Sequence, residues 1–369
     1  MKKRGRKRSK KRIFLIGLIG LDLFLAAVAL ICFLVMGALA DLLPSQQAAE
    51  RWQGESEMAF TQLSCFLPAD GKLDIDQIYK FRMDMQSKFH EAALDVDNDN
   101  QLYVDAWSTS GKVTATTAIG SGEASVIAVG GEFFNFHPIR LLSGSYLSER
   151  DLMQDKVLLD PEMAWLLFGG VDLQGMELRI NGVPFIVGGV VEREDDFASR
   201  EAYTAGMGLY MSYDAYSRLV ADAGISCYEL VAAEPVKGFA VSMVRAIFPI
   251  GQGEIRENSV RYSFSSLLTA AVQFARRSMQ TSGTMIPYWE NAARLVETWS
   301  ALLLFVGMVL CLLPAVTVVV FLIKGLGRLK EKLTEEVFPA IGDRVQEAIR
   351  VRQRKAWEKR HRGRHEKGY

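Results

Sequence analysis

The sequence has few histidines and cysteines, two residue types that often bind metal ions or take part in catalysis. Four of its 369 residues are histidine and four are cysteine. No histidine has a metal-ligating partner at suitable spacing, since His361 and His365, four residues apart, lie in a basic tail that repels cations. The patterns G-x-S-x-G and G-x-x-x-x-G-K-[ST] are also absent. These absences predict no catalytic residue, metal, cofactor or P-loop nucleotide, and therefore a protein that is not an enzyme.

Basic residues outnumber acidic residues at both ends of the chain, although the whole sequence has no net charge. Residues 1–12 hold nine Lys or Arg and no acid, and residues 324–369 hold fourteen Lys or Arg against seven Asp or Glu. Residues 41–298 hold 20 basic and 35 acidic residues, a net charge of −15. Basic tails around an acidic centre are typical of a chain that crosses a membrane. That topology explains the basic clusters, so we infer no nucleic-acid partner.

Two long apolar runs, residues 13–40 and 300–323, separate the tails from the centre. About 20 apolar helical residues cross the hydrocarbon core of a bilayer, so both runs are long enough. Lys and Arg favour the cytoplasmic side, which predicts cytoplasmic tails and an extracytoplasmic centre in the plasma membrane. The predicted parts are a basic tail, a first span, an extracytoplasmic domain, a second span and a basic amphipathic tail, at residues 1–12, 13–40, 41–298, 299–323 and 324–369.

A cleavable signal peptide is the alternative interpretation of the first run. Its flank is basic, and Ala38-Leu39-Ala40 has the small-residue pattern of a cleavage site. The apolar region of a signal peptide is about 7–15 residues long, however, and this run is about twice that length. The sequence therefore favours an uncleaved span, and the second run would anchor the domain in either case.

One acidic residue, Asp22, interrupts the first run. A carboxylate in the middle of a bilayer costs about 2.5–3.5 kcal/mol on insertion scales and usually faces a polar partner or a water path. Asp22 is therefore a candidate intramembrane polar site. If the span instead begins at Leu23, Asp22 lies near the inner headgroups beside the basic tail, and the sequence leaves both placements open.

The acidic centre is long enough to bury a core and to form two subdomains. Ser45–Leu63 is polar and helix-compatible, which predicts an outward extension of the first span. Apolar residues three and four apart predict an amphipathic helix over Ile75–Leu94. Strand-like runs follow at 102–107, 113–119 and 124–129, and the last two suggest a meander around Gly120–Gly122. A strand at 209–211, a helix at 213–223, a strand at 228–232 and a helix at 236–247 then predict a split βαβ subdomain with an added helix.

The clearest local pattern is MELRINGVPFIVGGVVE at residues 176–192. Asn181-Gly182 predicts a two-residue type I′ turn between two strands. That register puts the apolar side chains of both strands on one face, as the pairs 176–187, 178–185 and 180–183.

A short helix with clear end signals is predicted before the hairpin, at residues 160–170. Asp160 is a suitable N-cap, Pro161 suits the first helical position, and Gly169 suits the left-handed exit. With the hairpin, this helix predicts a small β-rich subdomain beside the split βαβ one. The predicted fold is an α+β extracytoplasmic domain anchored by two transmembrane α-helices.

The order of these elements over residues 73–247 resembles the extracytoplasmic core domain of MacB-like ABC transporter permeases, which include FtsX-like permeases. Three stretches carry the resemblance: VIAVGGEFFNFHPIRLLSGSYLSERD at 126–151, VLLDPEMAWLLFGGVDLQGMELRINGVPFIVGGVVE at 157–192 and GLYMSYDAYSRLV at 208–220. The second is similar to the family's strand, A-x-x-L-F-G helix and hairpin ending in V-x-G-V-V. Such permeases usually have four spanning helices, whereas here only one span follows the domain.

The resemblance implies a non-catalytic, permease-like subunit of an ABC-type transport or mechanotransmission system. A separate ABC ATPase, other membrane subunits or self-association are then the implied partners, beside the lipid bilayer. The alternative is a membrane-anchored extracytoplasmic ligand-binding or scaffolding protein that has kept the domain and has no transport activity.

The C-terminal tail has an amphipathic segment with a possible partner-docking face, made of Leu326, Leu329, Leu333 and Val337. Docking to a cytoplasmic partner is one interpretation, and an interfacial helix on anionic lipid is the other.

The predicted extracytoplasmic domain contains two further candidate sites. Asp95, Asp97 and Asp99 match the first ligands of a calcium loop, but the glycine and the bidentate glutamate are missing, so a solvated acidic turn is the better interpretation. Cys65 and Cys227 lie where a disulfide is permitted. The family's topology brings the returning chain onto the first subdomain, which makes their pairing possible.

Overall fold

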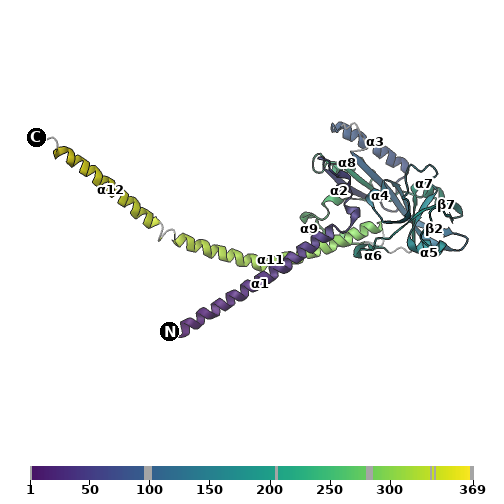
Figure 1. Cartoon of the computed structure of the whole chain (residues 1–369). Helices are drawn as coiled ribbons and strands as arrows, with labels where there is room; N and C mark the ends of the chain where they lie inside the picture. Colours follow the sequence, from purple (N-terminus) through teal and green to yellow (C-terminus); the bar gives the residue numbers. More distant parts are fainter. Residues whose placement is uncertain are drawn as a thin grey trace. The chain divides into compact units, whose positions relative to one another are not determined.

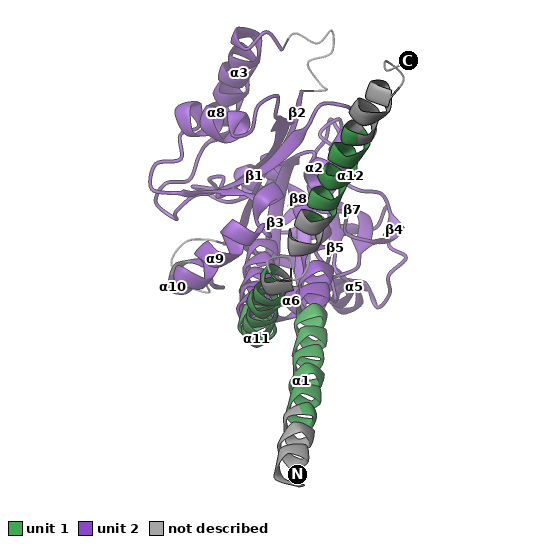
Figure 2. Ribbon diagram, turned by 90° about the vertical axis from the view of Figure 1, so that its left-hand side faces the viewer, with its two compact units in different colours: residues 1–32, 306–369 green, residues 33–305 purple. Residues whose placement is uncertain are grey.

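The computed structural model describes residues 2–94, 102–203, 207–279, 286–332, 335 and 338–365. The chain divides into two compact units, residues 33–305 and residues 1–32 with 306–369, which Figure 2 colours separately. The larger unit holds the sheet and the packed core, and it is called the outer domain below.

The smaller unit is helical. Its helices are the first part of α1 (Lys2–Ala40), the second part of α11 (Tyr288–Lys332) and α12 (Phe338–His365) (Figure 1). Two helices are long and apolar enough to cross a membrane, over Arg12–Ala40 and Tyr288–Arg328. Most of their large apolar side chains are exposed, as expected of surfaces that face lipid. Helix α11 continues through Pro314, and Pro339 lies in the first turn of α12.

All ten strands of the described chain belong to one sheet. Its order is β10-β1-β9-β2-β3-β8-β5-β7-β4, and β6 pairs with β2 and β7. The pairs β3–β8 and β5–β7 are parallel, and the others are antiparallel. The strands are β1 Phe60–Phe66, β2 Tyr103–Thr116, β3 Ser121–Gly131, β4 Leu141–Gly144, β5 Lys156–Leu159, β6 Glu177–Ile180, β7 Val183–Val191, β8 Gly208–Ser212, β9 Cys227–Ala233 and β10 Glu254–Glu257.

Two of the apolar cores pack on this sheet. In the first, α3 (Ile75–Glu91) and α8 (Phe239–Ile247) lie side by side on β1 and β9 (Figure 2). In the second, α5 (Pro161–Phe168) and α7 (Tyr213–Leu219) pack with β5, β7 and β8. The subdomains are not separate bodies, because β2 and β3 contribute to the sheet through both of them.

The remaining short helices lie mostly where the chain enters or leaves the sheet. They are η1 Pro44–Gln46, α2 Ala48–Gln53, α4 Phe133–Phe136, α6 Phe197–Ala202, η3 Asn258–Val260, α9 Phe264–Val272 and α10 Phe274–Arg277. A third apolar cluster, on the other face of β1 and β9, joins α2 and α4 to Trp289 at the start of α11.

The predicted local signals are confirmed at α5 and at the hairpin. The Asp160 carboxylate accepts a hydrogen bond from the Met163 amide at 2.7 Å, and Gly169 has the left-handed conformation. Asn181 and Gly182 have φ angles of +48° and +85°, as a type I′ turn requires. Leu178, Ile180, Phe185 and Val187 are buried as predicted, whereas Met176 and Val183 are half exposed.

Two predictions about the first part of the domain are wrong. Ser45–Leu63 does not extend the first span: α1 ends at Ala40, two short helices follow, and Phe60–Phe66 is an inner strand. The tertiary pairing of β1 with β9 and β10 overrides the helical propensity of this segment. The two strand-like runs 102–107 and 113–119 are also not separate, because β2 continues through Gly111.

The possible disulfide between Cys65 and Cys227 is not formed in this structure. Cys65 and Cys227 are free, and both are buried. They lie on paired strands one residue out of register, since Cys65 is opposite Tyr228 and Cys227 is opposite Phe66. Neighbouring residues of a strand point to opposite faces, so the two thiols lie in different cores. Burial raises the pKa of both thiols, which keeps them protonated and unreactive.

Some predictions fall on parts of the chain outside the described residues. The acidic turn at residues 95–100 is one of them, so the calcium interpretation is not tested. Leu333 and Val337 of the predicted docking face are also outside, as is the side chain of Leu329, while Leu326 is exposed on α11.

Candidate functional site

The first turns of α11 carry charged residues on a buried face. Glu290, Arg294 and Glu297 are spaced by four and three residues and therefore lie on one side of the helix. Each of their side chains is at most 1 % exposed. The charged side of this helix therefore faces the protein and not water.

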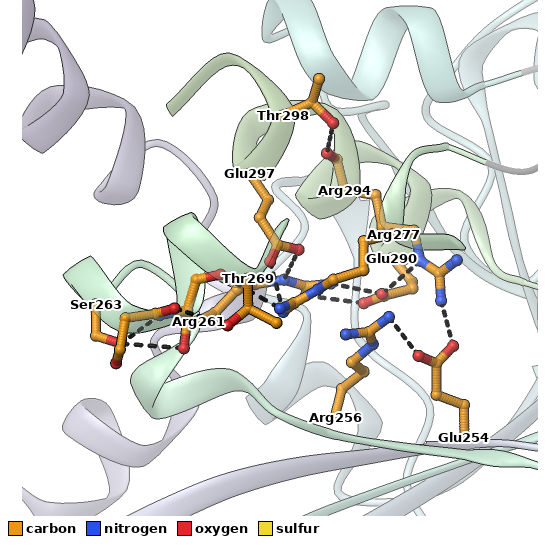
Figure 3. A network of polar contacts seen from close by, with 12 residues as sticks. Glu254, Arg256, Arg261, Ser263, Thr269, Arg277, Glu290, Arg294, Glu297 and Thr298 are labelled. Atoms are coloured by element: carbon orange, nitrogen blue, oxygen red, sulfur yellow. Dashed lines mark hydrogen bonds and ion pairs between the residues drawn. The ribbon is translucent and has the colours of Figure 1, made fainter. Parts of the chain in front are cut away.

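A buried ion network joins this face to the outer domain (Figure 3). Arg261, which follows η3, donates two hydrogen bonds to the Glu290 carboxylate, at 2.9 and 2.5 Å. Arg294 Nε donates to the same carboxylate at 2.8 Å. Arg261 also donates to the side-chain oxygen of Gln46, at 2.8 Å, and so ties the segment after α1 to the same carboxylate.

Two more elements extend the network. Arg294 Nη2 donates to Glu254 on β10 at 2.7 Å, and Arg256 on the same strand forms an ion pair with Glu254. Arg277, at the end of α10, lies 2.6 Å from the Glu297 carboxylate. Because β10 forms one edge of the sheet, the network connects that edge directly to the helix that continues into the second span.

The electrostatics favour the charged forms of Arg261 and Glu290. Burial alone would lower the pKa of Arg261, but the Glu290 carboxylate raises it above its usual value. Removing one partner of a buried pair leaves an uncompensated charge, which is more costly than breaking an exposed pair. The network therefore fixes one arrangement of α11 on the sheet edge.

An apolar cluster surrounds the network where both helices meet the outer domain. Leu43, after α1, packs with Ala198 and Ala202 of α6 and with Ala292 and Val296 of α11. One apolar cluster therefore holds both the segment after α1 and the first turns of α11.

A second buried polar group lies next to the start of α11. His137 Nε2 is 2.6 Å from the Glu229 carboxylate, which also accepts a hydrogen bond from Ser64 at 3.2 Å. The His137 ring lies 4.5 Å from the Trp289 ring, centroid to centroid. The His137 side chain is fully buried, so this group has no access for a substrate and acts as internal support.

A cavity of about 300 Å³ lies in the outer domain beside the first turn of α11. Its wall includes Glu194, Tyr203, Tyr210 and Tyr288. The rings of Tyr203 and Tyr288 are 4.3 Å apart, and the hydroxyls of Tyr210 and Tyr288 are 3.4 Å apart. The helix that carries the ion network therefore also lines the cavity.

The cavity wall presents a carboxylate with spare hydrogen-bonding capacity. Within the described residues, Glu194 Oε2 is buried and has no hydrogen-bond partner. Burial raises the pKa of Glu194, while the hydrogen bond with Tyr288 and the nearby His137 act in the opposite direction. Burial also raises the pKa of Tyr203 and of Tyr210, so their hydroxyls stay protonated and can donate.

The residues singled out from the sequence are not brought together. Asp22 lies on α1, where its Oδ1 has no hydrogen-bond partner among the described residues, and Leu326 lies on the exposed surface of α11. No group of three His, Cys, Asp or Glu side chains is placed to hold a metal ion in the described part of the chain.

The network and the cavity were not found by sequence reasoning. One signal was available for the network: charged residues at i, i+4 and i+7 directly before an apolar span, with no break between them. Its partners come from residues 46, 254, 261 and 277, whose proximity no local pattern shows.

Comparison with protein families gives a match to a known domain. A family model of the MacB-like periplasmic core domain matches residues 25–246, more than half of the chain. No curated protein matches the sequence.

Solved structures that are similar to this chain include two extracytoplasmic domains. The periplasmic region of MacB from Actinobacillus actinomycetemcomitans is 16% identical, covers 54% of this chain and 89% of its own, and has a TM-score of 0.40. The extracellular domain of the noncanonic ABC-type transporter YknZ from Gram-positive bacteria is 13% identical, covers 54% of this chain and 98% of its own, and has a TM-score of 0.37.

Proposed function

Because the chain belongs to the MacB-like periplasmic core domain family, whose model matches residues 25–246, we propose that it is a permease-like, non-catalytic membrane subunit of an ABC-type system. A separate ABC ATPase supplies the energy, since the sequence has no P-loop. Both basic tails lie in the cytoplasm, and the acidic outer domain lies outside the membrane.

The buried ion network is the observation that carries this proposal. Glu290 and Arg294 fix α11 to Arg261 and to the edge strand β10. A displacement of α11 in the membrane then moves the sheet edge with it, because the connection is made by several short, buried, charged contacts. The outer domain changes position or shape when the cytoplasmic ATPase moves the helices.

Transport requires assembly with further helices. Two spans enclose no polar route through a bilayer, and Asp22 interrupts the first span. The chain therefore associates with itself or with other membrane subunits. The amphipathic segment around Leu326 and Leu329 offers the cytoplasmic contact for the ATPase.

Purification under mild conditions tests the proposal. The full chain is expressed in its own host, extracted in a mild detergent, and analysed by size-exclusion chromatography and mass spectrometry. We expect an ABC ATPase and a complex larger than one chain. A monomer with no ATPase and no membrane partner would contradict the permease-subunit function.

The cavity favours a second candidate function, a membrane-anchored ligand-binding protein. A partly buried carboxylate oxygen without a partner and three phenol rings suit a small molecule with a cationic amine. Because Tyr288 also starts α11, an occupant of the cavity would contact the helix that enters the membrane.

Native mass spectrometry distinguishes this second candidate. The wild-type chain is compared with a Glu194→Gln variant, both purified from cells without a high-salt wash. A small molecule that is retained by the wild type and lost in the variant, together with no ATPase, supports the binding protein. Identical masses for both, apart from the substitution itself, count against it.

A further inference from the structure

The two short helices before α11 carry an exposed apolar stripe. In α9, Phe264, Leu268 and Val272 stand four residues apart and so lie on one side of the helix. Their exposed fractions are 58, 38 and 87 %, and Phe274 at the start of α10 is also exposed. Leu267 and Ala270 on another side of α9 are buried, so this helix is packed on the outer domain and still presents apolar side chains outward. A stripe of this kind is typical of an interaction surface.

The position of the stripe along α11 indicates what covers it. Arg277, at the end of α10, is tied to Glu297 by an ion pair of 2.6 Å. Glu297 is three residues before Ser300, the start of the predicted apolar run, and a helix rises 1.5 Å per residue, so the two lie about 4–5 Å apart along the axis. The network in Figure 3 thus holds the end of α10 at the level where α11 enters the membrane.

Apolar contacts place the segment around α9 and α10 at the same level. Tyr262 and Met279, which flank the two helices, pack against the apolar cluster that also holds Leu39 and Leu42 at the outer end of α1. The segment is therefore attached to the outer ends of both predicted spans.

The composition of this segment agrees with a lipid surface. Residues 258–289 contain no Asp or Glu, although the extracytoplasmic centre holds 35. The absence of acids suits a surface next to phosphate headgroups, where carboxylates are repelled. Apolar side chains on one side of a helix, with Ser and Thr on the next side, are typical of a helix that lies in the interface plane.

We propose that α9 and α10 lie in the outer headgroup layer, with Phe264, Leu268, Val272 and Phe274 against the boundary of the acyl chains. The partner is the lipid bilayer itself. The contact sets the depth of α11, because Arg277 and Glu297 join the two. This inference requires the membrane location of the chain and is independent of the proposed transport function.

Spin labelling of the full chain in lipid nanodiscs tests the proposal. The background carries Cys32→Ala and Cys311→Ala, since Cys65 and Cys227 are buried and do not label. A nitroxide is attached at Val272→Cys, and its collisions with oxygen and with a water-soluble nickel complex are measured. The matched control is Leu152→Cys, which is exposed elsewhere on the outer domain. We expect the label at 272 to lose most of the nickel accessibility of the control and to gain oxygen accessibility.

Two outcomes would overturn the proposal. Nickel accessibility at 272 equal to that at 152 would place the stripe in water. Shielding from both reagents would show that protein covers the stripe, either a second copy of this chain or another subunit. The same measurement at Phe264→Cys provides a second reading if the Val272→Cys variant does not fold.

Discussion

At the scale of single residues, Glu290 shows how a buried charge is tolerated. Its carboxylate accepts hydrogen bonds from Arg261 and Arg294, and its side chain is 1 % exposed. Desolvation of such a group is offset only while both arginines keep their geometry. The Glu290 carboxylate therefore adds little to the net stability. Its main effect is to hold the chain in one arrangement.

Glu290→Gln should destabilise the outer domain by about 3–5 kcal/mol, because the buried Arg261 and Arg294 would lose the negative charge of the carboxylate that both contact. The free energy of unfolding of the full chain in detergent measures the loss. Glu123→Gln is the matched control, since it breaks an exposed pair with Lys112 and should cost at most about 1 kcal/mol. Equal losses in the two variants would show that the network is not a fixed connection.

Glu194 should make the stability of the outer domain depend on pH. Burial raises its pKa, so the folded protein holds this proton where the unfolded chain has lost it. Its contribution is fully present below the ordinary glutamate pKa of about 4.3 and is lost as pH rises through the raised pKa. Wild type should therefore lose stability relative to Glu194→Gln over this window. A difference between the two that stays constant across the window would contradict the prediction.

At the scale of elements, the β6–β7 hairpin depends on the left-handed conformation of its turn. Gly182 has a φ of +85°, and no atom lies within 4 Å of the position that a Cβ would take. Gly182→Val should therefore cost about 1–3 kcal/mol through backbone strain alone. Gly170→Val, also in open space but without a positive φ, is the control. An unchanged melting temperature for the Gly182 variant would mean that the turn tolerates a β-branched residue.

Elements with local signals could be predicted from the sequence, and elements made by distant partners could not. The turn at Asn181-Gly182 and the cap at Asp160 depend on neighbours within a few residues. By contrast, β1 is a strand because β9 and β10 pair with it from more than 150 residues away. For the same reason the ion network, whose residues come from five separate segments of the chain, could not be predicted. Pairing with distant strands also explains the wrong assignment of residues 45–63.

The amphipathic tail offers a test at this scale. Leu329→Asp together with Leu333→Asp should abolish co-purification of the ATPase, because charges on the predicted docking face oppose apolar contact. The outer domain should keep its melting temperature, since these residues lie after the second span. Co-purification of the ATPase at wild-type levels would exclude this face as the docking site.

At the scale of the whole molecule, the charge distribution predicts the topology. Tags placed at residues 1 and 369 should both be protected from external protease in sealed spheroplasts. A protease site inserted at Gly120–Gly122, where the turn after β2 leads into β3, should be cut. Cleavage of either tag by external protease would show that the orientation is reversed or that one of the two runs does not cross the membrane.

The pairing of β1 also determines when this domain can be completed during its synthesis. Strand β1 leaves the ribosome soon after the first span, but its partners β9 and β10 end only at Ala233 and Glu257. Strand β1 thus lacks its full set of partner strands until nearly all of the outer segment has been translocated. Contacts between distant segments also form slowly. An apolar strand that waits unpaired is prone to aggregation. We therefore expect the nascent chain to need a chaperone on the extracytoplasmic side of the translocon until β10 emerges.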